Sequence, residues 1–522
     1  MRKHVALILL LTLLISLCAC GNTAPEQTTA AVDVPETAAV TETAAAAPKV
    51  LHIAESFGTT SLDPRKESNS WYTSIYGITQ TLFQIADDSS LVPWLAEKAE
   101  VDDSGLIWTV TIKENAHVSN GNDVTSQMVI RNLKSTAENI VNFAYLGDFQ
   151  YDAVDEKTFT ITTREINPTM LIDLAAPETA IVDLDNPGDY MNSIVGTGPF
   201  LLKQFQPEQL VVVEKDPNYW GGEVLLDEAW FHCIKDDDSR LMAMQNSEVD
   251  VHSNVNAAAL EIYNAAPEEY TVHSRPATRL QFYFLNQERL SDNVRAAINL
   301  AVDPEVLASF QKGIVSPTPG PFNPEAPYGK VTKPACDPEK ARSLLEEDGY
   351  TLNSKGFYEK NGQPLTVNIS YYSARSLDVI ALLMQEQLAD IGIQTEMTCV
   401  EDPDSTYIAS RDFDIGLYCM IADKAGDPYF FINSVLRDGC YYDIVGFDSP
   451  ECEALIDQLA TETDMARRAD LANQIVQIAI DDNAFGFTGL FNKTTVVRNG
   501  VTGVFENNPG DFYRVNEFTD IR

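Results

Sequence analysis

The sequence predicts an α/β fold with more than one hydrophobic core. Residues 49–522 are too many for one simple core, and Trp, Tyr and Phe are spread through all of them. Segments 365–371 and 393–400 are predicted strands on either side of a helix at 376–391. If they share a sheet, this order gives a parallel unit with a right-handed crossover. We therefore expect mixed sheets with flanking helices, divided into two or three lobes.

Short runs of β-branched and aromatic residues predict the strands, and apolar residues at helical spacing predict the helices. The predicted strands are 50–54, 107–112, 157–162, 210–214, 365–371 and 393–400. The predicted helices are 70–82, 126–139, 292–301, 338–349, 376–391, 449–459 and 465–480. Caps support these bounds: Asp337 and Pro338 are typical of a helix start, and Gly349 of a helix end.

Charge and hydropathy predict an N-terminal leader. Arg2, Lys3 and His4 precede an almost wholly apolar run at 5–17. This run is shorter than the roughly 20 residues that a membrane-spanning helix needs. It is typical of a signal peptide, which we assign to residues 1–19.

The end of this leader, residues 17–21 (LCACG), resembles the lipobox of bacterial lipoproteins. The resemblance implies that Cys20 receives a diacylglycerol, whose two chains are enough for stable anchoring. A plain signal peptide that happens to end in Cys is the alternative. Residues 20–48 are then the lipidated Cys and a disordered tether, because Ala, Thr, Glu and Pro dominate them and no aromatic residue occurs. The folded part is expected on the extracellular face of the bacterial cell membrane, held there through its lipid only.

The formal net charge of −41 restricts the partners. A balance this acidic argues against nucleic acid, which needs a basic footprint. It also argues against adhesion to anionic lipid. Solubility outside the cell explains the charge most simply, and a preference for cationic ligands is the alternative.

The cysteines give no metal or redox signature. Of the eight, Cys18 lies in the leader and Cys20 at the anchor, and none of the other six stands in a CxxC pair. Disulfides are permitted outside the cell, and Cys440 and Cys452 are the nearest pair in the sequence. Buried free thiols are the alternative.

No motif supports catalysis, since the sequence has no GxSxG elbow, no HExxH and no P-loop. We expect no enzyme activity, no cofactor and no metal site. A surface enzyme or an adhesin on a lipoprotein tether remains a distant alternative.

Short sequence blocks occur in a recognisable order between residues 49 and 490. They are SLDP at 61–64, LVPWLAE at 91–97, GLIWTV at 105–110, VSNG at 118–121, VGTGPF at 195–200, NYWGG at 218–222, SDNVRAA at 291–297, LADIGI at 388–393, FDI at 413–415 and GDP at 426–428. Together they resemble the family 5 extracellular solute-binding proteins of ABC importers. This group includes oligopeptide-, dipeptide- and nickel-binding proteins.

The resemblance implies a three-lobe, periplasmic-binding-protein-like clamp of class II, with the ligand between lobes I and III. Lobe I comprises residues 49–84, 190–278 and 488–522, lobe II residues 85–189, and lobe III residues 279–487. The implied function is to capture a peptide or similar small solute outside the cell. The chain then delivers the solute to the permease subunits of its importer, acting as a monomer.

Asp423 is the first predicted ligand contact. In peptide-binding members an acidic residue just before an Asp/Glu-Pro step holds the α-ammonium of the ligand, by a charge-assisted hydrogen bond. Asp423 matches this position and Asp427 is the second choice, although one residue more separates the two acids than in the family pattern. For Asp427 we favour the alternative that Asp427-Pro428 only caps a turn.

The other predicted contacts are aromatic or cationic: Trp71, Tyr72, Tyr429, Arg437, Tyr441 and Tyr442. In the family the segment around Trp71 often lines the cleft, where a planar ring can stack on the ligand. Core packing is the alternative. Arg437 either clamps a ligand carboxylate or is a surface charge.

The resemblance leaves two ligand classes open, a peptide and a nickel or other metal chelate. Metal-chelate binders place an arginine soon after a Leu-Ala-x-Pro stretch, but here residues 174–177 (LAAP) are followed by Glu178. Segment 137–142 also has no arginine where nickel binders have one. A carboxylate in place of a guanidinium repels an anionic chelate, so we favour a peptide. Residues 236–238 (three Asp) would suit calcium, but they match the family's turn before a helix.

Overall fold

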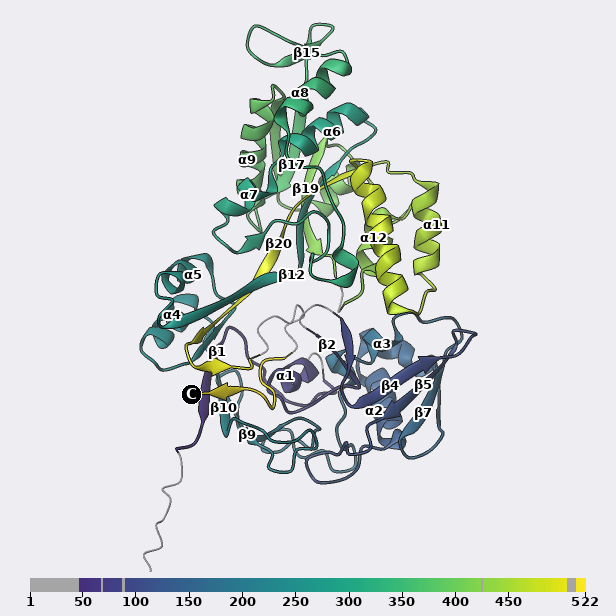
Figure 1. The fold of residues 1–522 in the computed structure, drawn as a ribbon, viewed down its shortest axis with the longest axis vertical. Coiled ribbons are helices and arrows are strands. Elements are labelled where there is room, and N and C mark those ends of the chain that lie inside the picture. Colours follow the sequence, from purple (N-terminus) through teal and green to yellow (C-terminus); the bar gives the residue numbers. More distant parts are fainter. Residues whose placement is uncertain (1–46, 67–68, 87–89, 424–425, 505–512) are drawn as a thin grey trace, which may run out of the picture. The chain divides into compact units, whose positions relative to one another are not determined.

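The computed structural model describes residues 47–66, 69–86, 90–423, 426–504 and 513–522 (Figure 1). The predicted signal peptide, Cys20 and nearly all of the predicted tether lie outside these residues. Residues 48–522 form one compact unit of the chain. In the described residues no helix is both long enough and apolar enough to cross a membrane.

The largest sheet has eleven strands and carries most of the long-range pairing. Its order is β18 (Gln394–Val400), β17 (Thr366–Tyr372), β19 (Ile415–Ile421), β12 (Tyr270–Leu285), β20 (Phe485–Arg498), β11 (Val251–Ser253), β1 (Val50–Glu55), β10 (Glu228–Cys233), β9 (Leu210–Lys215) and β8 (Phe200–Gln206), with β13 (Val315–Ser316) paired to β20. Strands β17 and β18 are parallel, with Thr366 opposite Gln394, and α9 (Leu377–Asp390) connects them. The parallel unit predicted from the sequence is therefore confirmed.

Two long antiparallel strands, β12 and β20, join the two halves of this sheet (Figure 1). β12 pairs with β19 on one side, and β20 pairs with β11 on the other. Their register shifts between Pro276 and Leu280. Such an irregularity bends and twists a strand pair locally.

The C-terminal end of β12 is buried on both faces. Successive side chains of a strand point to opposite sides, and here each side packs against its own apolar cluster. Phe282 and Phe284 join the apolar cluster that includes α11 (Pro450–Leu459) and α12 (Met465–Asp481). Tyr283 and Leu285 join the cluster of α6 (Asp292–Ala301), α8 (Pro338–Glu347) and α9. Helices thus cover both faces of this part of the sheet (Figure 1).

A second, four-stranded sheet is antiparallel throughout. Its order is β4 (Ala96–Val101), β5 (Ile107–Ile112), β7 (Thr158–Thr162) and β6 (Gln150–Ala153). Helix α2 (Ser126–Asn139) packs its buried Val129 and Leu133 against the apolar side chains of this sheet. The smaller pairs are β2 (Phe83–Ile85) with β3 (Leu91–Pro93), β14 (Thr351–Leu352) with β15 (Tyr358–Lys360), β15 with β16 (Gln363–Pro364), and β21 (Val501–Thr502) with β22 (Asp520–Ile521).

The remaining helices are short and many begin at a capping side chain. They are α1 (Asn69–Ile75), α3 (Met170–Asp173), α4 (Asp237–Gln245), α5 (Ala257–Asn264), α7 (Pro304–Phe310) and α10 (Tyr429–Phe431). Asp337 accepts a hydrogen bond from Lys340 N at the start of α8, as predicted. The helix predicted at 70–82 is too long. It ends at Ile75, because Gly77 adopts a φ of 67° and a Cβ there would lie 2.9 Å from the Phe200 ring.

All six cysteines of the described residues are free thiols. The bridge considered between Cys440 and Cys452 is therefore not formed. The alternative of buried free thiols holds only in part: Cys419 and Cys452 are buried, whereas Cys336 and Cys399 are exposed. Cys452 is buried in α11 among apolar side chains, where burial raises the pKa of its thiol to about 12.

Candidate ligand-binding cavity

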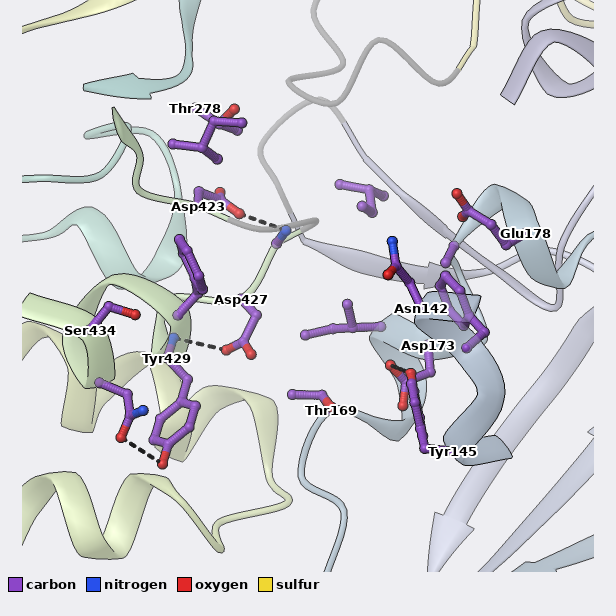
Figure 2. A pocket seen from close by; sticks show the side chains of 18 residues that line it. Asn142, Tyr145, Thr169, Asp173, Glu178, Thr278, Asp423, Asp427, Tyr429 and Ser434 are labelled. Atoms are coloured by element: carbon purple, nitrogen blue, oxygen red, sulfur yellow. Dashed lines mark hydrogen bonds between the residues drawn. The ribbon is translucent and has the colours of Figure 1, made fainter. Parts of the chain in front are cut away.

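A cavity of about 860 Å³ lies between two stretches of the chain that are distant in the sequence. One wall comes from residues 85–178 and the other from residues 278–434. Figure 2 shows their side chains facing each other across the hollow. These walls belong to the segments predicted as lobes II and III, with Thr278 from the end of predicted lobe I. The cavity therefore does not lie between lobes I and III, where the ligand is expected from the sequence. The volume suits a small-molecule ligand.

The lining of the cavity is acidic. It contains four carboxylates, Asp173, Glu178, Asp423 and Asp427. Its neutral polar side chains are Asn142, Tyr145, Thr169, Thr278, Tyr429, Asn433 and Ser434. Among the described residues that line it, none is Lys, Arg or His. The cavity therefore offers hydrogen bonds and negative charge to a ligand.

Asp423 follows the end of β19 and is only 4% exposed. Its carboxylate accepts hydrogen bonds from neutral donors, the Gly426 N–H at 2.7 Å and the Tyr328 hydroxyl. Burial raises the pKa of Asp423 to about 6, because desolvation disfavours the charged form more than these donors stabilise it. A positively charged group of a ligand would stabilise the ionised form of Asp423 and offset the cost of its desolvation.

Asp427 already has a cation. Its Oδ1 lies 2.8 Å from Nη2 of Arg468, an arginine of α12 that is 1% exposed. The same Oδ1 accepts a hydrogen bond from Tyr429 N at 3.0 Å, which is the turn-capping role that the sequence analysis favours for Asp427. Arg468 also donates to the carbonyls of Leu459 and Glu462. Asp427 thus anchors the wall to α12.

The opposite wall carries Asp173 at the end of α3 and Glu178 in the 3₁₀ turn Pro177–Thr179. Asp173 accepts hydrogen bonds from the Tyr145 hydroxyl at 2.8 Å and from Asn167 Nδ2 at 3.0 Å. Burial raises the pKa of Asp173 to about 6 and also raises the pKa of Glu178. The nearby charge of Asp427 raises the pKa of Asp173 further, so the two walls interact electrically across the cavity.

Arg65 holds the turn that carries Glu178. Its guanidinium donates to the Glu178 carbonyl at 3.0 Å, to the Ala180 carbonyl at 2.7 Å and to Asn132 Oδ1. Burial lowers the pKa of Arg65 to about 10, still far above neutrality. Arg65 binds backbone and amide oxygens rather than the Glu178 carboxylate, so it positions this wall and leaves the acid charge in place.

Of the eight predicted ligand contacts, Asp423, Asp427 and Tyr429 line the cavity. The Tyr429 hydroxyl donates to Asn433 Oδ1 at 3.1 Å, within the same wall. Sequence reasoning did not select Asp173, Tyr145, Thr169 or Asn433, which have no local signature. Glu178 was singled out only because it follows the LAAP stretch.

The structure places the other five away from the cavity lining. Trp71 packs on Phe57 with ring centroids 4.7 Å apart, and the Tyr72 hydroxyl donates to the Gly58 carbonyl. Arg437 pairs with Asp457 at 2.9 Å. Two tyrosines complete the set: Tyr441 is 66% exposed, and the Tyr442 hydroxyl lies 2.9 Å from that of Tyr418.

No group of three or more His, Cys, Asp or Glu side chains suited to a metal ion occurs in the described part of the chain. Residues 236–238 show why a run of acids is no such site. Asp236 accepts from Ser239 N at the start of α4, and Asp237 pairs with Arg240.

The mixed α/β architecture and the ligand-sized cavity define a periplasmic-binding-protein-like solute-binding protein. Residues 90–443 match the model of the bacterial extracellular solute-binding proteins, family 5, middle region. This match covers more than half of the chain, and the chain belongs to that family. The family and the fold class predicted from the sequence are thereby confirmed.

Individual relatives cover most of the chain. The nickel-binding periplasmic protein of Escherichia coli (strain K12) is 28% identical over 427 residues, which are 75% of this chain and 80% of the relative. The glutathione-binding protein GsiB of the same strain is 27% identical over 360 residues, 66% of this chain and 68% of that one.

Solved structures show the same fold. The structure of a nickel ABC transporter protein from Bacillus halodurans superposes with a TM-score of 0.83 at 26% identity, covering 91% of this chain and 100% of that one. The unliganded open form of MppA, a periplasmic murein tripeptide binding protein, superposes with a TM-score of 0.78. At 18% identity MppA shows the fold alone, and it covers 91% of this chain and 97% of its own.

Proposed function

We propose that this chain is the solute-binding component of an ABC importer, and that it captures a short peptide through the α-ammonium group. Membership in a solute-binding family supports the first part. The acidic lining of the cavity, without a cationic side chain among its described residues, carries the second. It performs no catalysis, and delivers its solute to the permease subunits.

Asp423 is the proposed partner of the ammonium. Asp423 is buried and lines the cavity. The hydrogen-bond donors described for its carboxylate, the Tyr328 hydroxyl and the Gly426 N–H, are both neutral. An ammonium placed there makes a charge-assisted hydrogen bond in a region of low dielectric, where such bonds are strong. A ligand carboxylate placed against these acids would be repelled, because like charges at close range cost several kcal/mol. The α-carboxylate of the peptide is therefore expected to lie away from the four acids.

A nickel complex is the second candidate, because the Escherichia coli relative at 28% identity is a nickel-binding protein. The charge of the lining restricts this candidate to complexes without net negative charge. An anionic chelate finds no cationic side chain among the described lining residues.

The location and lobe organisation are also part of the proposal. We place the leader at 1–19, the lipid on Cys20 and the tether at 20–48, so that a monomer is anchored outside the cell. The division into lobe I (49–84, 190–278 and 488–522), lobe II (85–189) and lobe III (279–487) is supported by the register shift between Pro276 and Leu280, next to the 278/279 boundary.

Native mass spectrometry of residues 49–522, purified from rich medium, tests the ligand class. A co-purified set of peptides supports the main proposal, and a bound nickel complex supports the second candidate. Calorimetry then compares trialanine with N-acetyl-trialanine. We expect the acetylated peptide to bind at least about tenfold more weakly. Equal binding of the two peptides would remove the ammonium from the mechanism.

A further inference from the structure

The wall opposite Asp423 also presents carboxylates for which the described lining supplies no cation. Asp173 accepts hydrogen bonds from Tyr145 and Asn167, both of them neutral. Glu178 lines the same side of the cavity, and the arginine behind it binds its backbone carbonyl instead. Figure 2 shows these two acids across the hollow from Asp423 and Asp427.

A single ammonium bound at Asp423 would leave this second wall uncompensated. Two buried carboxylates have an arginine: Asp427 has Arg468, and Asp414 has Arg289 at 2.7 Å. Asp183, also buried, instead accepts hydrogen bonds from the side-chain amides of Asn120 and Asn122. Closing a ligand into the cavity would remove more water from Asp173 and Glu178. The desolvation of a charge is unfavourable unless a partner of opposite charge replaces the water.

We propose that the cavity has a second cation subsite at Asp173 and Glu178, and that its solute is a short peptide with a basic side chain. This inference rests on the proposed function, because it uses the same cavity. The α-ammonium binds Asp423 on one wall, and a lysine ammonium or arginine guanidinium binds the opposite wall.

The apolar lining fits the stem of such a side chain. Phe143 and Ile172 line the same wall as the two acids. Lys and Arg bury their methylene stems against apolar surface while the charged head reaches a polar group. The cavity volume of about 860 Å³ leaves room for more than the basic residue itself.

Two matched tripeptides test the inference by calorimetry at about pH 7.5, above the pKa of about 6 of Asp423 and Asp173. Ala-Lys-Ala and Ala-norleucine-Ala have stems of similar length and differ in the terminal ammonium. We expect Ala-Lys-Ala to bind at least about tenfold more tightly. In an Asp173→Asn/Glu178→Gln protein the ratio of the two affinities should fall to about one.

Glu138→Gln is the matched control, because Glu138 is an exposed acid of α2 outside the cavity lining. It should leave the affinity ratio unchanged. Glu178→Gln alone is the second test if the double variant fails to fold, and it should lower the ratio part of the way.

The outcomes separate the two proposals. Equal affinities of both tripeptides, or a lysine preference that persists in the double variant, would overturn the second subsite and leave the peptide proposal standing. Binding of N-acetyl-Ala-Lys-Ala with undiminished affinity would overturn the role of Asp423 and leave the second subsite standing. If neither tripeptide binds, both proposals fail.

Discussion

Glu55 and Asp423 are both almost fully buried, at 1% and 4% exposure, but the groups that bind them differ in charge. Glu55, in the central sheet, accepts a hydrogen bond from Nε of Arg514 at 2.8 Å and another from the Ser253 hydroxyl. Asp423, in the cavity, accepts hydrogen bonds from a tyrosine hydroxyl and a backbone N–H. The first region neutralises its acid with its own arginine. The second region retains an acid whose pKa burial raises to about 6.

We propose that this difference, together with the position of Asp423 in the cavity lining, separates an acid that holds the fold together from one that binds a ligand. Whether an acid has an arginine partner does not depend on its distance from the cavity. Asp427 lines the cavity and is nevertheless paired with Arg468. Burial and position alone would put Asp423 and Asp427 in one class. The presence or absence of a buried arginine puts them in two.

The largest effect should come from Asp427→Asn, because it leaves the buried Arg468 without an opposite charge. Removing one partner of a buried ion pair costs about 3–5 kcal/mol. We expect about 3 kcal/mol, since the amide oxygen still accepts the hydrogen bond. The shift of the urea midpoint measures this loss.

Asp423→Asn is the matched control at about pH 7.5. It should not destabilise the ligand-free protein, because it removes a buried charge that has no cationic partner among the described residues. The new amide oxygen can still accept the hydrogen bond from the Gly426 N–H. A loss of stability as large as that of Asp427→Asn would show that Asp423 stabilises the ligand-free protein as much as the paired acid does.

Binding should show the reverse order. Asp423→Asn should weaken trialanine binding about 30- to 150-fold, since a hydrogen bond to a charged group contributes about 2–3 kcal/mol. Calorimetry measures this change directly. Asp448→Asn, which removes an exposed acid outside the cavity lining, should change nothing. Unchanged affinity in Asp423→Asn would exclude Asp423 from the site.

The sequence predicts local elements well where one segment contains the whole signal. The helices predicted at 126–139 and 292–301 have the bounds of α2 and α6, because apolar spacing and a capping Thr or Ser coincide. The strands β12 and β20 were not predicted. β12 contains Pro276 and β20 contains two glycines, which disfavour strands locally, and their pairing joins residues about 200 positions apart.

Residues that line the cavity could be selected from the sequence only near a family block. Asp423 was selected because it precedes the GDP block, whereas Asp173 lies in a short helix with no motif and meets the other wall only through the fold. Arg437 is near the GDP block too, but it is not among the residues that line the cavity, so its role stays a prediction. It lies ten residues after Asp427, but the chain turns it toward α11, where it pairs with Asp457.

Acid should weaken binding. The pKa values of Asp423 and Asp173 are both raised to about 6, and a cation binds their ionised forms. Below about pH 6 each protonated group lowers the affinity, by at most about tenfold per pH unit. Calorimetry of Ala-Lys-Ala between about pH 7.5 and 5 measures this fall.

The stability of the ligand-free protein should change in the other direction. A carboxyl whose folded pKa exceeds its unfolded value binds more protons when folded. Through Asp423 and Asp173, stability therefore rises as the pH falls through 6 toward the unfolded value of 3.8. In the calorimetry, an affinity for Ala-Lys-Ala that stays flat between about pH 7.5 and 5 would show that the cation does not bind these acids.

The smallest effect is expected for a third kind of acid, one that caps the N-terminus of a helix. Asp236 caps α4 by accepting from Ser239 N at 2.8 Å, and Asp237 pairs with Arg240. Asp236→Ala should cost about 1 kcal/mol of stability, as the loss of an N-cap does, with no change in peptide affinity. Because the carboxylates at 236 and 237 already have partners, excess calcium should not raise the melting temperature. A rise on adding calcium, lost in Asp236→Ala, would show that this run of acids binds a cation after all, and that an acid with a partner inside the protein can still take a ligand.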